Sequence, residues 1–121
     1  MLRDIHNNFA WFIILSNGFA GAWVLAANWI EQLRTRAMWW FVILAESSIF
    51  LQVAMGVGMV AGQEIEAPKF HMFYGFIAII VIGILYSYRA QLEHKKYLLY
   101  GFGGLFIMGL GIRAMLVGSV S

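Results

Sequence analysis

The sequence predicts an all-α integral membrane protein, an up-down bundle of four transmembrane helices that forms a single domain over residues 1–121. With 62% hydrophobic residues, 12% charged residues and a mean hydropathy of +0.78, the chain cannot bury its apolar side chains in one water-soluble core. These residues gather in four segments of roughly 19 to 24 residues each, the length at which a helix crosses a hydrocarbon core of about 30 Å. The bilayer is therefore the expected solvent.

The predicted spans cover residues 9–29, 38–61, 70–88 and 97–117. Because the connections between them are short, successive helices should lie antiparallel and adjacent. The first segment lacks the small-residue cleavage site of a signal peptide, so we expect it to be retained as a span.

Basic residues set the expected orientation. Of the eight Lys and Arg residues, five lie in the first and third loops, namely Arg34, Arg36, Arg89, Lys95 and Lys96. The positive-inside rule places these loops in the cytoplasm and both termini on the extracytoplasmic side. We therefore expect a multi-pass protein of the cell membrane.

Composition also limits the chemistry. The chain has no cysteine, which excludes disulfides, thiolate-held metals and thiol nucleophiles. The net charge of +2 comes from loops beside apolar spans, so it indicates orientation and not nucleic-acid binding. Neither an HExxH metal motif nor a phosphate-binding glycine loop is present. We expect no enzyme activity, except as a subunit of a larger oxidoreductase.

Small residues recur at spacings that place them on single helix faces. Such stripes let helix backbones approach closely in lipid, where apolar surface alone gives no driving force. The partner helix can belong to this chain or to another subunit, and the spacing favours neither. The stripes are Gly18 and Ala22 in the first segment, Ala54, Gly58 and Gly62 in the second, and Gly104, Gly111 and Gly118 in the fourth.

Four polar residues inside the predicted spans are candidates for a functional or structural role. Glu46 is the most costly, because an ionised carboxylate at that depth needs a partner or a proton. It is either a proton-relay or ion-coupling group, or a carboxyl that holds helices together near Tyr86 to Tyr88. Asn17 and Gln52 lie at similar expected depth and are predicted to bond to each other across two helices. Arg113 lies near the outer end of the last span, where its side chain can reach the interface.

A polar layer is expected at the outer face, formed by His6, His71 and the charged residues Asp4, Glu64, Glu66 and Lys69. His6 and His71 open the first and third segments, so they can ligate a haem iron from opposite sides, with Arg113 or Lys69 neutralising the propionates. The alternative is that both histidines bond the Glu64/Glu66 turn or a partner protein. By the predicted spans, His6 lies outside the first helix.

Two resemblances add to this interpretation. The run Gln52-Val53-Ala54-Met55-Gly56 followed by His71 resembles half of the haem A synthase family, which implies a haem-ligating histidine on the third span. Over its whole length, the chain looks like the small multi-span accessory subunits of bacterial, actinobacterial-type cytochrome bc and haem-copper oxidase supercomplexes. That second resemblance is carried by size, by the small share of soluble structure and by the stretches 6–12 and 67–71.

The leading functional prediction is a non-catalytic accessory or assembly subunit of a membrane respiratory complex. It would pack against larger integral-membrane subunits in a hetero-oligomer, bind phospholipid and need neither a cofactor nor nucleic acid. One alternative is a small bis-histidine membrane cytochrome that transfers electrons through haem bound by His6 and His71. Another is a small proton- or ion-conducting module that uses Glu46.

Overall fold

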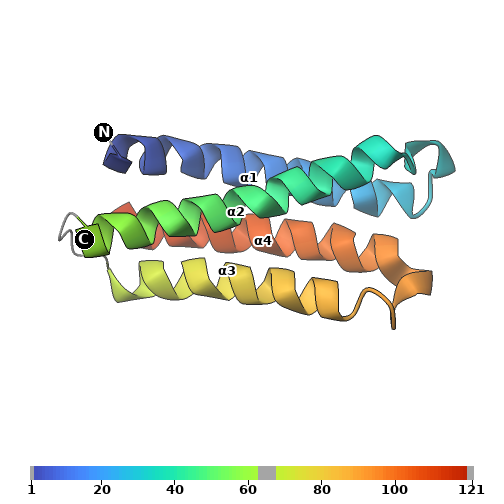
Figure 1. Cartoon of the computed structure of the whole chain (residues 1–121). Helices are drawn as coiled ribbons and strands as arrows, with labels where there is room; N and C mark the ends of the chain where they lie inside the picture. The colour runs from blue at the N-terminus through green and yellow to red at the C-terminus, as the bar shows by residue number, and fades with distance from the viewer. Residues whose placement is uncertain (1, 63–67, 120–121) are drawn as a thin grey trace.

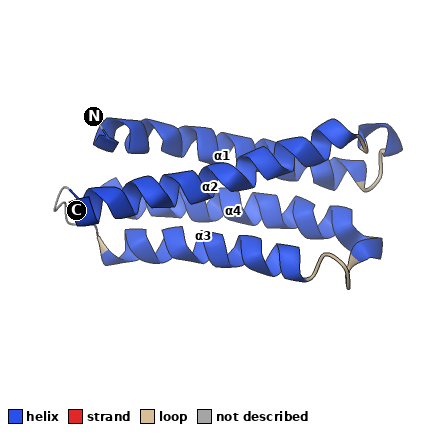
Figure 2. Cartoon of the chain, in the orientation of Figure 1, coloured by secondary structure: helices blue, strands red, loops and turns tan. Residues whose placement is uncertain are grey.

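The computed structural model describes residues 2–62 and 68–119, and within these ranges the chain is helical with no strand (Figure 2). The elements are α1 (Leu2–Ala27), α2 (Arg36–Gly62), α3 (Lys69–Ser87) and α4 (Lys96–Ser119). Short 3-10 turns, η1 (Glu31–Leu33) and η2 (Glu93–Lys95), precede α2 and α4. The predicted all-α, four-helix architecture is confirmed.

The helices run up and down, so that each lies antiparallel to the next (Figure 1). The α1/α4 interface is the most extensive, α3 packs on α4 and α2 packs on α1, whereas the α2/α3 interface is small. The start of α1, the end of α2, the start of α3 and the end of α4 all lie at one end of the bundle, which we call the terminal end. The opposite end, which carries η1 and η2, we call the basic end.

Glycines bring α1 and α4 into backbone contact. A Cβ atom placed on Gly104 would lie 2.8 Å from the Cα atom of Gly21, and one placed on Gly101 would lie 2.8 Å from the Cα atom of Leu25. Any larger residue would therefore push the two helices apart. Dispersion contacts between closely spaced backbones are the main attraction available to helices in lipid, so this contact explains why α1 and α4 pair although they are farthest apart in the sequence.

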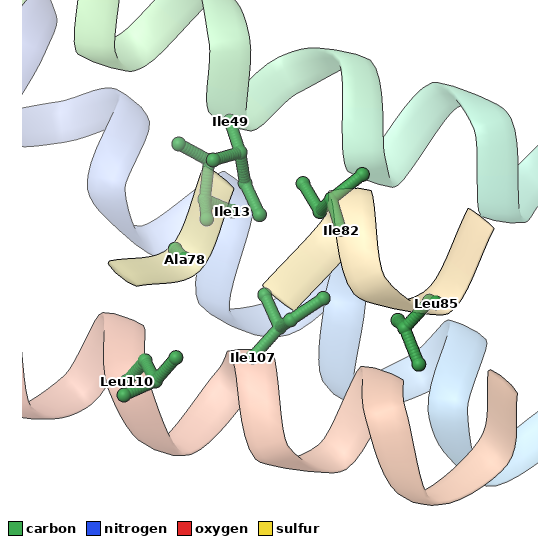
Figure 3. Close-up of a cluster of buried hydrophobic side chains, with 7 residues drawn as sticks. All are labelled: Ile13, Ile49, Ala78, Ile82, Leu85, Ile107 and Leu110. Carbon is green, nitrogen blue, oxygen red and sulfur yellow. The ribbon is translucent and has the colours of Figure 1, made fainter. Parts of the chain in front are cut away.

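Two clusters of buried apolar side chains complete the packing. One lies nearer the basic end and joins α1 to the first half of α2, and its buried members are Ala20, Val24, Ala27, Met38, Val42 and Ala45. The other draws on all four helices in the middle of the bundle and consists of Ile13, Ile49, Ala78, Ile82, Leu85, Ile107 and Leu110 (Figure 3). The second cluster is the only place in the described chain where buried apolar residues of α3 meet those of α1 and α2.

The outward surface of the bundle is apolar. Large side chains such as Leu15, Trp40 and Phe70 are 65–69% exposed, and exposed apolar residues occur on every helix. In water such a continuous surface would drive association, whereas in a bilayer it contacts lipid chains. All four helices are long and apolar enough to cross a membrane, which fits the expected membrane bundle.

The first helix begins earlier than the sequence indicated. It starts at Leu2 and not at Phe9, so His6 lies within the helix and the expectation that it falls outside is wrong. The predicted span was counted from Phe9, where the long apolar stretch begins. Asp4 instead sits in the first helical turn, where a carboxylate stabilises the helix dipole.

Replacing Gly104 by alanine should destabilise the bundle by about 1–3 kcal/mol, because the new methyl group would overlap the backbone of Gly21. The matched control is Gly109→Ala on the same helix, where a Cβ atom meets nothing within 4 Å. The free energy of unfolding in mixed detergent micelles, followed by circular dichroism, measures both. Equal stability of the two variants would contradict the α1/α4 contact described above.

Candidate functional site

Two histidines face each other across the terminal end of the bundle. His6 on α1 and His71 on α3 have ring centroids 6.0 Å apart and ring planes at 70°. Both side chains are half-buried. The sequence placed both residues in one polar layer, and the structure brings their rings together from helices that are diagonal in the bundle.

A cavity of about 700 Å³ surrounds this pair and is lined by all four helices. Its inner wall includes five residues of the central apolar cluster, namely Ile13, Ile49, Ala78, Ile107 and Leu110. Because the α2/α3 interface is small, space is left between these two helices, and both contribute to the lining. A concave, mostly apolar site of this size with a few converging polar groups is typical of a small-molecule or cofactor site.

His71 is held by α4. Its Nδ1 atom lies 2.7 Å from the carbonyl oxygen of Ala114. Since a carbonyl only accepts, Nδ1 carries the proton and the lone pair lies on Nε2. Gly118, four residues further on, lets the ring lie against the helix, because a Cβ atom there would be 2.7 Å from Nδ1. The bond thus orients the imidazole with Nε2 as the nitrogen available to a metal.

His6 is held by α2 in a related way. The side-chain Nε2 of Gln52 donates a 2.6 Å hydrogen bond to the backbone carbonyl of His6. Gly56, four residues further on, provides the space for the ring, because a Cβ atom there would lie 3.2 Å from Cε1 of His6. Within the described chain, Nδ1 of His6 and Oε1 of Gln52 are buried and make no hydrogen bond of good geometry, although the backbone carbonyl of Gln52 lies close enough to act on the His6 ring.

The pair of imidazoles suits a metal held from two opposite sides. Two metal–nitrogen bonds of about 2.0–2.1 Å each, with the short distance from each nitrogen to its ring centre added at both ends, sum to roughly the observed 6.0 Å. The described residues form no group of three or more metal-ligating side chains. Haem needs only two, since the porphyrin supplies the other four nitrogens. The residues present therefore fit a bis-histidine haem.

Charged groups around the cavity differ from those expected. Among the described lining residues, Arg3 carries the positive charge. Lys69 and Arg113, which the sequence suggested as partners for propionates, are both exposed and do not line the cavity. Glu64 and Glu66 lie outside the described residues. Arg3 was not singled out, because the helix was expected to begin at residue 9.

The predicted amide pair does not form. Asn17 is 1% exposed and its Nδ2 donates to the carbonyl oxygens of Ile13 and Ala45, at 2.9 and 3.3 Å. Gln52 bonds His6 instead. The depth comparison counted from Phe9, and the earlier start of α1 brings His6, and not Asn17, level with Gln52. Asn17 is a link between α1 and α2.

Glu46 lies away from the cavity, nearer the middle of α2, and is half-buried. Across the bundle it lies within electrostatic reach of Tyr100 of α4, on which Arg89 and Tyr86 also act. Within residues 2–62 and 68–119, the Glu46 carboxylate makes no hydrogen bond or ion pair. Within the described residues, Glu46 therefore makes no direct bond to Tyr86, and Tyr100 lies within electrostatic reach of both side chains.

The small-residue stripes separate into inward and outward groups. Gly18 packs on Met108, Gly104 on Gly21, Gly111 on Ile14 and Gly118 on His71, so these four serve contacts inside the chain. Ala22, Ala54 and Gly62 are exposed, and Gly58 is half-buried. The stripe on α2 therefore faces largely away from the bundle. Gly21 and Gly101, which carry the closest contact, were not in any predicted stripe.

Replacing Asn17 by alanine should lower the unfolding free energy in detergent by about 0.6 kcal/mol, and at most by about 1.7 kcal/mol, the average and the maximum for hydrogen bonds between helices in membranes. The loss follows from removing the bond to Ala45 on α2. Asn8→Ala, at an exposed position on the same helix, is the control and should change stability little. An Asn17 variant as stable as the control would show that this bond does not join the two helices.

No protein-family model, curated protein or solved structure matches this chain.

Proposed function

We propose that this protein is a small membrane cytochrome that binds one haem between His6 and His71 and transfers electrons. The observation that carries the proposal is the pair of imidazole rings, 6.0 Å apart, inside a largely apolar cavity. Haem, when bound, supplies one-electron redox chemistry. The residues of this chain bind it, orient it and limit the access of water.

The contacts around His71 support a ligand role. The bond from Nδ1 to the Ala114 carbonyl leaves Nε2 free to bind iron and makes the ring a better electron donor. An axial ligand would require both this tautomer and the space that Gly118 leaves behind the ring. Similarly, Gly56 makes space for His6.

The cavity lining supports the same chemistry. Apolar side chains from four helices match the faces and edges of a porphyrin, and their low polarity favours the less charged state of a metal centre. Arg3 lies at the rim, where it would pair with an anionic substituent such as a propionate. In this proposal Arg3 takes the role that the sequence had given to Lys69 or Arg113.

The proposed orientation follows from charge. With Arg34, Arg36, Arg89, Lys95 and Lys96 at the basic end, the positive-inside rule places that end in the cytoplasm and the terminal end outside. The haem would then lie near the extracytoplasmic surface of the cell membrane. Electrons would be exchanged with a donor or acceptor on that side.

A second candidate, compatible with the first, is an accessory subunit that packs against larger integral-membrane subunits of a respiratory complex. The observation that favours it is the α2 stripe, in which Ala54 and Gly62 are exposed and a Cβ atom at Gly62 meets nothing within 4 Å. An outward face of small residues suits close approach by another helix.

The purified protein, expressed with haem supplied, should show a Soret band and the spectrum of a low-spin, six-coordinate haem. His71→Ala and His6→Ala should each abolish this spectrum, because each removes one axial ligand. His94→Ala, an exposed histidine at the basic end, is the control and should retain it. A folded protein that remains colourless would refute the proposed function.

If the α2 stripe is an interface, Ala54→Leu and Gly62→Leu together should reduce co-purification with partner subunits in mild detergent. The side chains would obstruct the approach of a second helix without disturbing the bundle. Gly83→Leu on α3, also open to the surface, is the control. Unchanged co-purification of the double variant would rule out this face as the contact.

A further inference from the structure

At the basic end of the bundle, two cationic side chains meet over one aromatic ring. The guanidinium carbon of Arg34 lies 4.5 Å from the centre of the Tyr97 ring, and Nζ of Lys96 lies 5.4 Å from it. Together the two distances keep the cations within one Debye length of each other, which is about 10 Å at roughly 0.1 M salt, so they repel each other. The ring attracts both cations and offsets part of this repulsion. An anion at this place would be attracted by both groups.

The carboxylates of the described chain neutralise only part of this charge. Lys96 pairs with Glu93 at 3.1 Å on the surface, where such a pair is worth little. Among the residues that the structure describes, Arg34 has no carboxylate partner. Its Nε and Nη2 atoms donate to the carbonyls of Ala27 and Asn28, at 2.7 and 2.9 Å, and hold the guanidinium at the end of α1. A guanidinium carries five N–H groups, so others remain for an external acceptor.

An apolar groove begins beside the same arginine. It is an open hollow of about 370 Å³ lined by Phe19, Ala22, Trp23 and Leu33, and its lining is almost entirely apolar. Leu33 immediately precedes Arg34 in the chain, and its carbonyl accepts a 3.0 Å hydrogen bond from Nε1 of Trp23. This bond satisfies the polar group of the tryptophan and ties η1 to α1. The apolar groove and the fixed cation are therefore parts of one surface.

This combination fits an amphiphile with an anionic head. A soluble anion would leave the apolar groove empty, and an uncharged lipid would leave the cations unpaired. A phosphate group accepts charge-assisted hydrogen bonds from a guanidinium and an ammonium, and basic residues beside a membrane span attract anionic phospholipids. Trp29 and Trp40, both largely exposed, lie at the same end of the bundle, as do the aromatic residues that mark the headgroup level of a membrane.

We infer that the basic end binds an anionic phospholipid, with its phosphate held by Arg34 and Lys96 and one acyl chain lying in the apolar groove. This site lies at the opposite end of the bundle from the cavity around His6 and His71. It therefore goes beyond the proposed function and does not depend on haem.

The lipid would join the ends of three helices. Arg34 follows α1, and Tyr97, on α4, packs against Trp39 of α2 with ring centres 5.8 Å apart. A headgroup held over Tyr97 would therefore contact the place where these helices meet. Because a ligand that binds only the folded protein stabilises it, this lipid would also stabilise the bundle.

The affinity for lipid tests the inference. The full-length protein in mild detergent is titrated with phosphatidylglycerol or with phosphatidylcholine of the same chains, and native mass spectrometry measures the bound fraction. Phosphatidylglycerol should bind more tightly, because it carries a net negative charge. Arg34→Gln and Lys96→Gln should each weaken its binding by about fivefold, the effect of one basic residue near anionic lipid, and leave phosphatidylcholine binding unchanged.

The matched control for charge is Arg89→Gln. Arg89 lies at the same end, with its guanidinium 3.6 Å from the centre of the Tyr86 ring and bonded to the Tyr86 carbonyl. The control removes the same charge from a similar setting outside the Arg34/Lys96 pair, so it should leave the preference for phosphatidylglycerol intact.

A second variant tests the apolar groove without changing any charge. Ala22→Phe should fill the groove and weaken binding of both lipids alike, because they have the same chains. Ala54→Phe, at an exposed alanine of α2 outside the groove, is its control and should change neither affinity. Circular dichroism checks that every variant is folded.

Equal affinity for the two lipids, or an equal loss of phosphatidylglycerol binding in Arg34→Gln and Arg89→Gln, would show only diffuse attraction to a basic surface and would overturn the inference. A dimer in the same spectra that Ala22→Phe dissociates would assign the groove to a second copy of the chain, and would also overturn it. A colourless protein that retains the predicted lipid preference would refute the haem proposal alone.

Discussion

Contact between the backbones of α1 and α4 is the constraint on which the remaining structure depends. Gly21, Gly101 and Gly104 bring the two helices together, α2 packs on α1, and α3 packs on α4. This arrangement places α1 and α3 diagonally, with little contact between α2 and α3. A tightly packed square of four helices would leave no room at the terminal end. The close α1/α4 contact thus leaves room for the cavity between α2 and α3.

The histidine pair follows from this geometry. A diagonal separation is wide enough for two imidazole rings to face each other with a cofactor between them, and the glycines at positions 56 and 118 set each ring against a neighbouring helix. The backbone carbonyl of Ala114 then orients the ring of His71, and the side chain of Gln52 holds the backbone of His6. The same few residues therefore determine both how the helices pack and how the two histidine rings are oriented.

The fold class was predictable because long apolar segments and short loops leave few arrangements in a membrane. His6 and His71 were also predicted to share a layer. The hydrogen bond between Gln52 and His6 was not predicted. The estimated depth of a residue in the membrane depends on where its helix begins, and the first span was expected to begin at Phe9, whereas α1 begins at Leu2. Nor does glycine spacing show which glycine meets which helix: Gly21 and Gly101 carry the closest contact although neither lay in a predicted stripe.

The pairing of the first helix with the last has a consequence for biogenesis. Helices enter the membrane in the order of synthesis, so the glycine face of α1 has no partner until the final helix has been inserted. Residues from α4, among them Ala114 and Gly118, are also required before the ring of His71 is fixed. The pocket is therefore completed only after α4 has entered the membrane, and any prosthetic group that contacts all four helices must be acquired after that step.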